Sequence, residues 1–356
     1  MSSWHRVSGL TAAAALLAAC GTGQATQPAS SGVLNAPTPT IAAEASTTPR
    51  PTQDFTVRDG EAWIAFQWIG GAGDGIFLVR PDGTSLHRIA ADAASSQSHP
   101  DWSPDGQRLA FVAETATDRT ELWVVDADGT DAKRLLSCDV PCNQVSYPDW
   151  APDGRSIYFG LDADASADAP PTTFRVARYD LATGKTTIVL ERKDGMSAEQ
   201  PRISPDGAHV VYTRFRDDGA ASAIFVADLK GGPEHRLTEW ELLGAHPDWS
   251  IEDLIVFNTR DLAAFQDTTE PANLYTIAVD GSDLRQLTTF GSSATRATQP
   301  RWTPDGTGIV FTQVDGSGFG ERRLAFINAD GSGRDWLTPS PLAGTHPQLR
   351  PLADSG

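Results

Sequence analysis

The chain has 356 residues, with 46 acidic and 28 basic side chains, which give a formal net charge of −18. It offers no basic stripe to phosphates, which argues against a nucleic-acid partner; the acidic surplus suits a soluble surface or a cationic partner. The length fits one large all-β domain or two ordinary domains.

The first residues have the pattern of an export signal. His5 and Arg6 precede an apolar, alanine-rich run at 10–19, which is too short to span a bilayer as a helix. The sequence LAACG at 17–21 resembles the lipobox of bacterial lipoproteins. This resemblance implies a signal peptide at 1–19, cleavage before Cys20 and attachment of lipid to Cys20. An ordinary export signal and a chance cysteine are the alternatives.

The segment at 20–55 is rich in Ala, Thr, Ser and Pro and has few large apolar side chains. Such a composition cannot bury enough surface to offset the entropy lost on ordering. We therefore expect a disordered tether between the lipid and a folded domain at 56–352.

An eight-residue phrase organises the folded domain and recurs six times. It reads HPDWSPDG at 99–106, YPDWAPDG at 147–154, QPRISPDG at 200–207, HPDWSIED at 246–253, QPRWTPDG at 299–306 and, truncated, HPQLRP at 346–351. Successive copies lie about 50 residues apart, and a strand-rich repeat of this length is typical of the blades of a β-propeller.

Each unit predicts four strands, a to d, with strand a at the Pro-x-Trp segment. Ser-Pro-Asp-Gly suits the a–b turn, and Asp-Gly suits most c–d turns. The first unit, from Ala62 onward, lacks strand a, whereas the last fragment, 346–350, has only that strand. We therefore predict an all-β fold: a six-bladed β-propeller of four-stranded antiparallel blades, whose first blade is completed by the C-terminal strand.

Two features of the phrase carry further expectations. The Trp position is apolar in every unit, which predicts a core anchor for each blade interface. These anchors are Trp102, Trp150, Ile203, Trp249, Trp302 and Leu349. In the fifth unit the a–b turn reads SIED at 250–253, without Pro or Gly, so we expect a longer or differently shaped turn with Asp253 at positive φ.

Strand order then predicts the functional face. Turns a–b and c–d emerge together on one face, and loops b–c and d–a emerge on the other, where they are long and differ between units. Variable loops on a rigid scaffold commonly build binding sites, so this loop-rich face is the expected functional face. Its candidate contact residues, which alternatively only cover the loops, are Arg216, Trp240, Arg260, Phe265, Arg296 and Phe319.

The phrase xPxWSPDG, followed by an apolar strand and an LxVxDxDG segment that ends near RxLT, is similar to the repeats of TolB-type six-bladed propellers. The ending occurs at 236–238, 286–288 and 336–338. The resemblance covers 56–351 and implies the fold. TolB itself is a protein-interaction platform with an additional N-terminal α/β domain, which we do not find in this sequence. Similar repeats occur in accessory domains of serine peptidases and in sugar-processing lyases, so the resemblance leaves the function open.

Six residues precede the repeat prolines, and symmetry places them around the central channel at its mouth on the loop-rich face. They are His99, Tyr147, Gln200, His246, Gln299 and His346. We expect a solvated lining that is also the candidate ligand-binding site, with a metal site as a further alternative that we do not favour. His246 is expected to lie across the ring from His99 and His346, too far to share one ion with them.

Other motifs point to structure. The aspartates of DADGTD at 126–131 fit a c–d turn better than a calcium loop. Cys138 and Cys142 are predicted to form a local disulfide, because exported proteins favour disulfides over free thiol pairs. No Gly-x-Ser-x-Gly elbow, phosphate loop or dinucleotide fingerprint occurs in the sequence, and no catalytic residue or cofactor is predicted.

These observations favour a non-catalytic binding or scaffold protein, anchored by lipid in the bacterial cell envelope and monomeric. Its expected partner is an envelope protein, a peptide or a glycan. The alternative is a glycan-processing enzyme or sugar-binding protein that uses the His and Gln side chains of the channel.

Overall fold

The computed structural model describes residues 60–69, 74–90, 96–115, 119–138, 142–162, 174–216, 220–259, 271–291, 295–316, 320–339 and 342–352. The predicted signal peptide, Cys20 and the whole of the predicted tether lie outside these residues. Within the described part of the chain, no helix has the length and apolar character that a membrane span needs.

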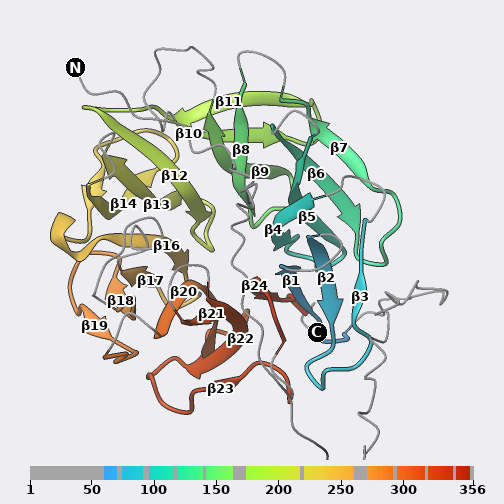
Figure 1. The fold of residues 1–356 in the computed structure, drawn as a ribbon. Helices are drawn as coiled ribbons and strands as arrows, with labels where there is room; N and C mark the ends of the chain where they lie inside the picture. Colours follow the sequence, from blue (N-terminus) through green and yellow to red (C-terminus); the bar gives the residue numbers. More distant parts are fainter. Residues whose placement is uncertain are drawn as a thin grey trace, which may run out of the picture. The chain divides into compact units, whose positions relative to one another are not determined.

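Six four-stranded antiparallel sheets form the blades of a ring (Figure 1). Blade 1 contains β24 (Thr345–Leu349), β1 (Ile64–Trp68), β2 (Gly75–Val79) and β3 (His87–Arg88). Blade 2 contains β4 (Ser96–Trp102), β5 (Arg108–Glu114), β6 (Thr120–Asp126) and β7 (Lys133–Leu136). Blade 3 contains β8 (Gln144–Trp150), β9 (Ser156–Asp162), β10 (Phe174–Asp180) and β11 (Lys185–Leu190).

The other three blades follow the same order. Blade 4 contains β12 (Met196–Ile203), β13 (His209–Arg216), β14 (Ser222–Asp228) and β15 (His235–Arg236). Blade 5 contains β16 (Gly244–Trp249), β17 (Leu254–Thr259), β18 (Leu274–Ala278) and β19 (Arg285–Gln286), and the short 3-10 helix η1 (Trp240–Leu242) precedes it. Blade 6 contains β20 (Thr295–Trp302), β21 (Gly308–Asp315), β22 (Glu321–Asn328) and β23 (Asp335–Trp336).

The predicted closure of the ring is confirmed. The C-terminal strand β24 pairs antiparallel with β1, and the register places Leu349 opposite Ile64 and Gln348 opposite Ala65. In Figure 1 the red C-terminal strand lies beside the blue N-terminal strand. Blade 1 is therefore built from both ends of the folded domain.

The hydrophobic core lies between the blades as six clusters, one for each pair of neighbours. The predicted anchors Trp102, Trp150, Ile203 and Trp302 are between 4% and 8% exposed, and Trp249 and Leu349 are partly buried against the same clusters. Burying one such side chain stabilises the fold by roughly 1.5–3 kcal/mol, so the anchors act as core residues as expected.

Each b strand also contributes one buried aromatic side chain, at a position outside the repeated phrase. These side chains are fully buried: Phe66, Phe111, Phe159, Tyr212, Phe257 and Phe311.

The turns largely follow their sequence. In the blade 2 a–b turn, Gly106 adopts φ +65° and its N–H donates to the Ser103 carbonyl at 2.8 Å. In blade 5, Asp253 adopts φ +58°, as predicted. The blade 5 turn is not longer, however. Ser250 N–H donates to the Leu254 carbonyl, four residues on, whereas the other a–b turns span five residues. In blade 4 the c–d glycine with positive φ is Gly231.

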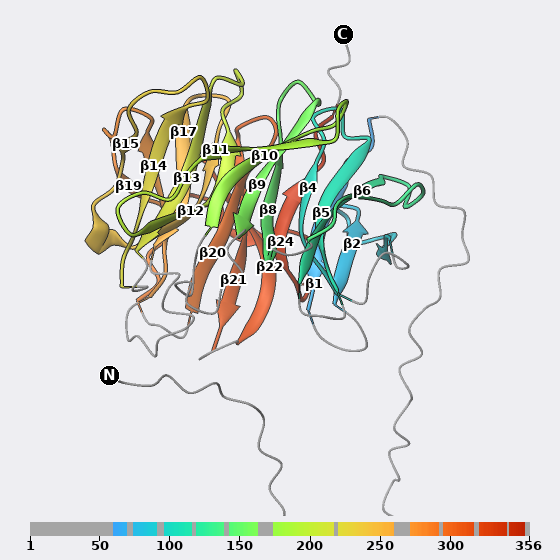
Figure 2. The ribbon, with the colours of Figure 1, turned by 90° about the horizontal axis from the view of Figure 1, so that it is seen from above.

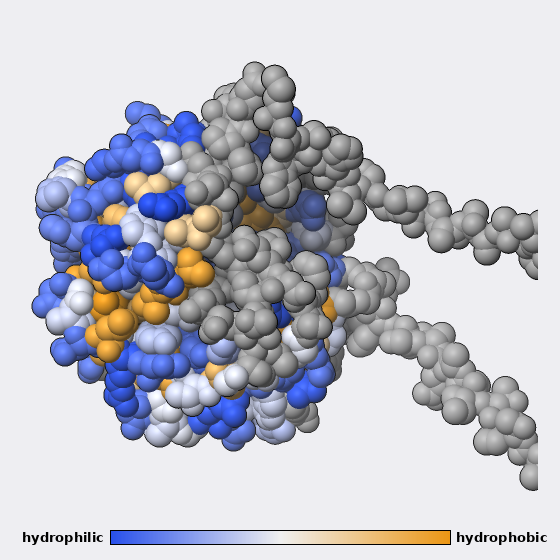
Figure 3. Space-filling model, turned by 60° about the vertical axis from the view of Figure 1, so that its left-hand side comes forward, coloured by the Kyte–Doolittle hydropathy of each residue, from blue (hydrophilic) through white to orange (hydrophobic). Residues whose placement is uncertain are grey.

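Figure 2 views the ring from its side, with the strands running between two faces. The a–b and c–d turns form one face, named here the short-turn face, and the b–c and d–a connections form the loop-rich face. The part of the surface that Figure 3 colours is largely hydrophilic, with hydrophobic areas between the hydrophilic side chains. This agrees with the chain's charge of −18 and with a core placed between the blades.

Candidate functional site

The residue before each repeat proline occupies an unusual backbone conformation. All six have a positive φ, between +46° and +57°. In blades 2 to 6, the pairing of strand a with strand b changes register at this residue, as it does at a β-bulge. An L-residue whose backbone is in the left-handed region has a higher free energy. Contacts with the rest of the fold must therefore hold these six residues in this conformation. Repetition of the bulge brings the six side chains to one axis.

The rings of four of these residues pack together at the axis. The centroid of His99 lies 4.1 Å from that of Tyr147 and 4.5 Å from that of His346. His246 lies 5.3 Å from Tyr147 and 6.4 Å from His346. His246 therefore comes from across the ring, yet its side chain still reaches Tyr147 and approaches His346. The channel is narrow enough for side chains from opposite blades to meet.

Hydrogen bonds fix this cluster. His246 Nδ1 lies 3.1 Å from Asn258 Oδ1, and its Nε2 lies 3.0 Å from the Tyr147 hydroxyl. Gln200 Oε1 accepts from the His246 N–H and from the Thr213 hydroxyl, each at 2.8 Å. These contacts join strands a and b of neighbouring blades. The six residues therefore belong to the internal structure of the ring.

Burial corrects the expectation of a solvated lining. His246, Gln200 and His346 are 2%, 5% and 8% exposed, and the other three residues are half-buried. Burial, with His246 and Arg202 nearby, lowers the pKa of His99 to about 3. Burial and the neighbouring histidines hold the pKa of His346 well below its usual value. Both imidazoles are neutral at neutral pH, so they act as hydrogen-bonding groups rather than cations.

A second axial ring, missed from the sequence, comes from the residue after each repeat proline. Its members are Asp101, Asp149, Arg202, Asp248, Arg301 and Gln348. All six are buried or nearly so. The repeated phrase contained the signal for this ring, because the position after the proline holds an acidic, basic or amide residue in every copy.

This charged ring connects neighbouring blades. Asp101 Oδ2 accepts the backbone N–H of Trp150 at 2.8 Å, and Asp248 Oδ2 accepts that of Trp302 at 2.7 Å. Asp149 bonds Ile203 in the same way, and Gln348 bonds Trp102. At four of the six interfaces, one axial side chain therefore holds the backbone of the next blade at its anchor. Arginine takes this position at the other two interfaces.

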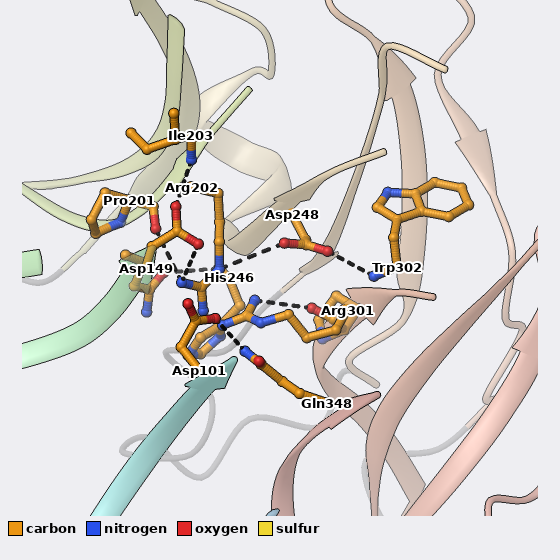
Figure 4. Close-up of polar contacts among 12 residues, drawn as sticks. Asp101, Asp149, Pro201, Arg202, Ile203, His246, Asp248, Arg301, Trp302 and Gln348 are labelled. Carbon is orange, nitrogen blue, oxygen red and sulfur yellow. Dashed lines mark hydrogen bonds and ion pairs between the residues drawn. The ribbon is translucent and has the colours of Figure 1, made fainter. Parts of the chain in front are cut away.

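Arg202 lies at the centre of the charged ring (Figure 4). Its Nη1 donates to the Pro148 carbonyl at 3.0 Å and to Asp149 Oδ1 at 3.2 Å. Its Nε lies 3.6 Å from Asp248 Oδ1. One guanidinium thus joins blades 3, 4 and 5.

The three carboxyl groups share too little positive charge to ionise freely. Burial raises the pKa of Asp248 to about 7, against the opposing effect of Arg202. Burial likewise raises the pKa of Asp101 and Asp149, in spite of the same guanidinium. The ring therefore favours partial protonation near neutral pH.

A cavity of about 190 Å³ opens from the charged ring toward the short-turn face. Its floor is polar and its walls are aromatic and proline side chains. They include Asp101, Trp102, Pro104, Asp149, Trp150, Pro152, Asp248, Arg301, Trp302, Pro304, Gln348 and Pro351. The described axial cavity thus lies at the opposite end of the channel from the expected mouth.

The short-turn face also carries exposed apolar side chains near this cavity. Ile251 is 58% exposed and occupies the place that proline has in the other a–b turns. It packs beside Gly306 in the next a–b turn, because a Cβ built on Gly306 would lie 3.0 Å from the Ile251 side chain. Leu352, 48% exposed, follows the cavity residue Pro351. The irregular turn of blade 5 therefore presents an isoleucine where the other turns present proline.

The cysteine pair and the DADGTD turn adopt the predicted local structures. Cys138 and Cys142 form a disulfide, with sulfurs 1.98 Å apart. Asp128 caps its own turn by accepting the Thr130 N–H at 2.9 Å, as expected of a c–d turn. Among the loop-face candidates, Arg260, Phe265 and Phe319 lie outside the described residues.

The other three loop-face candidates, Arg216, Trp240 and Arg296, lie within the described residues. Arg216 lies over the Trp240 ring at 5.3 Å, and Arg296 is buried. Within the described residues, no group of three or more His, Cys, Asp or Glu side chains is arranged to hold a metal ion. The loop-rich face thus stays a prediction, because many of its connections are not described.

No family model matches the chain. Over 128 residues it is 28% identical to "Uncharacterized peptidase YuxL" of Bacillus subtilis, a match that covers 35% of this chain and 18% of that protein. Over 47 residues it is 47% identical to "Tricorn protease homolog 1" of Streptomyces coelicolor, covering 13% of this chain and 4% of that protein. The chain thus spans less than a fifth of the length of these curated relatives.

Two solved structures share the architecture. TolB from Acinetobacter baumannii superposes with a TM-score of 0.63 at 19% identity, over 84% of this chain and 67% of that chain. The putative TolB from Agrobacterium tumefaciens gives 0.57 at 19% identity, over 80% and 90%. At these identities the likeness shows the fold alone, which is the six-bladed propeller predicted from the repeats.

Proposed function

We propose that this protein is a non-catalytic binding or scaffold protein of the bacterial cell envelope, and that its partner is a protein or peptide that docks on the short-turn face. The supporting observation is the combination of a polar axial cavity with an exposed apolar rim. Concave sites with a few convergent polar groups are the usual place for ligands on a rigid scaffold, and exposed apolar side chains suit a protein partner.

Two of the axial histidines are poorly suited to acid–base catalysis near neutral pH. A group that serves as a general acid or base near neutral pH needs a pKa close to that pH. The pKa of His99 is about 3, and that of His346 is also lowered. The rival function, a glycan-processing enzyme that uses this ring, would need a different protonation behaviour from these two imidazoles.

Anchoring belongs to the same proposal. The lipobox-like residues at 17–21 and the polar composition of 20–55 support a lipid on Cys20 and a tether of roughly 30 Å r.m.s. span. The domain boundaries we propose are a signal peptide at 1–19, the lipidated tether at 20–55 and the propeller at 56–352. Mass spectrometry of the purified membrane form tests the anchor, because a diacylated or triacylated peptide that begins at Cys20 is expected.

Ile251→Lys tests the docking face. The side chain is 58% exposed, so this change should leave the unfolding midpoint nearly unchanged while it places a charge on the apolar rim. In pull-downs from solubilised membranes of the source bacterium, we expect recovery of the partner to fall about tenfold or more, since a charge in the apolar part of an interface costs more than 1.4 kcal/mol.

Leu284→Lys is the matched control, because Leu284 is 50% exposed but lies in a c–d turn, away from the a–b turns whose prolines line the cavity. It should bind like the unmodified protein. Equal loss in both variants would point to a nonspecific charge effect, and unchanged recovery with Ile251→Lys would refute docking at this rim. Loss confined to deletions in the loop-rich face would restore the site predicted from the sequence.

A further inference from the structure

The outer strand of blade 3 differs from the outer strands of the other blades. β11 contains six residues, Lys185–Leu190, whereas β7 contains four and β3, β15, β19 and β23 contain two each. It stands at the end of its sheet, in the order β11-β10-β9-β8. A long outer strand presents a row of backbone N–H and C=O groups to a further strand.

The side chains of β11 suit such pairing. Its sequence, KTTIVL, is rich in β-branched residues and contains no proline. Ile188 is 38% exposed, one of the five large apolar side chains most exposed among the described residues. The strand also borders a cleft of about 780 Å³ between two blades, with Thr187, Ile188 and Val189 on the side of blade 3 and Ile203 and Leu229 on the side of blade 4. An added strand would therefore find its backbone partners along the outer edge of β11, next to this cleft.

We propose that β11 pairs antiparallel with β11 of a second copy of this chain, about a two-fold axis at Ile188. The charges at the two ends of the segment favour this occupant. In this register Lys185 lies opposite Glu191 of the other copy, and the pair occurs twice. Opposite charges placed directly across an antiparallel pair stabilise it, and like charges oppose it.

The geometry also limits the strength of the dimer. β11 shifts its register against β10 between Val176 and Ala177, which shortens the regular ladder. Glu191 already pairs with Arg175 at 2.9 Å, but its side chain is 69% exposed and keeps free lone pairs for a second cation. We therefore expect reversible dimerisation with a Kd in the micromolar range, separate from the docking face proposed above.

Charge exchange tests the register. Sedimentation equilibrium of the full chain, carrying Cys20→Ser so that no lipid is attached, should show a monomer–dimer equilibrium. Lys185→Glu and Glu191→Lys should each weaken self-association at least tenfold, because each places two like-charged pairs across the interface. An equimolar mixture of the two variants should recover the dimer, since every facing pair is then opposite in charge.

Lys133→Glu on β7, the next longest outer strand, is the control and should dimerise like the unmodified chain. Recovery in the mixture also shows that both variants are folded. The proposal is overturned if the unmodified chain stays monomeric at its highest soluble concentration. It is equally overturned if either single variant dimerises normally, or if the mixture fails to associate.

Discussion

At the pre-proline position, one backbone conformation is shared by three kinds of side chain: His, Tyr and Gln. None of the six is glycine, although glycine would adopt a φ near +50° at lower cost. The strain, roughly 1–3 kcal/mol per residue, must be offset by contacts of the side chains themselves. The packed rings of His99, Tyr147 and His346 and the bonds of His246 are such contacts. The cluster therefore reads as one cooperative unit.

Asp248 gives a pH prediction at the same scale. Its folded pKa is about 7, raised from 3.8, so between these pH values the folded chain holds more protons than the unfolded chain. The free energy of unfolding should therefore fall as the pH rises from about 4 to about 7. Asp248→Asn keeps an oxygen for the Trp302 N–H and removes this dependence.

Urea unfolding of both proteins across this range measures the effect, and the variant should gain stability relative to the unmodified protein as the pH rises. The lowered pKa values of His99 and His346 act with the opposite sign, because they favour folding as the pH rises toward 6.5. They are present in both proteins and largely cancel in the difference. A difference that stays constant with pH would contradict the assignment.

How far the residues could be predicted depends on what the repeat encodes. Periodicity placed His99, Gln200 and His246 in one ring, because equal positions in equal blades lie at equal distances from the axis. It could not give their burial, which depends on how closely six bulges approach across the channel. It also could not show that Asp101, Asp149 and Asp248 bond the next blade, because that contact joins residues about 50 positions apart.

At the scale of the strand, β24 carries the closure of the ring. It pairs with β1 and brings Gln348 to Trp102 and to Asp101, at 3.2 Å and 2.8 Å. Truncation after Ala343 removes this strand and exposes the cores on both sides of blade 1. We expect a loss of most of the stability of the fold, seen as insoluble protein or as a fall of well over 10 °C in Tm.

Truncation after Leu352 is the matched control, because it removes only residues 353–356 and keeps β24 complete. It should melt like the full chain. Near-normal Tm after truncation at Ala343 would show that β1 to β3 form a stable blade without the closing strand, contrary to the ring argument.

Strands and turns were the most predictable elements. Pro, Asp and Gly at fixed positions select the turn type, and Asp253 took the positive φ that glycine takes in the other a–b turns. The length of the blade 5 turn was not predictable, because the flanking strands can pair whether or not the turn is shorter by one residue. The length of β11 could not be predicted either, because no sequence signal marks where an exposed outer strand ends.

The whole ring is held by two different sets of contacts. Apolar clusters fill the space between the blades, and these followed from the repeated phrase. Polar side chains join the blades again at the axis, where the charged ring and the imidazole cluster replace a solvated channel. The repeated phrase predicted the first set because it is periodic. Of the second set it placed the pre-proline residues in one ring, but it did not reveal their burial or the contacts of the charged ring.

Arg202 contacts Asp149 and Asp248 and acts electrostatically on Asp101, so its removal tests the axial network as a whole. Arg202→Met fills a similar volume but leaves Asp149 and Asp248 without their cation. Removing one partner of a buried ion pair typically costs about 3–5 kcal/mol. The cost should be larger at pH 8 than at pH 5, because carboxyl groups whose pKa is already raised can take up a proton at the lower pH.

Arg301→Met is the comparison, since the contact that the structure shows for its guanidinium is with the Pro300 carbonyl at 3.1 Å. It should cost less and should show little of the pH dependence. Urea unfolding of both variants at the two pH values decides the matter. If both lose the same stability at both pH values, the arginines act only through packing, and within the charged ring the blades are joined by the backbone bonds of Asp101, Asp149, Asp248 and Gln348.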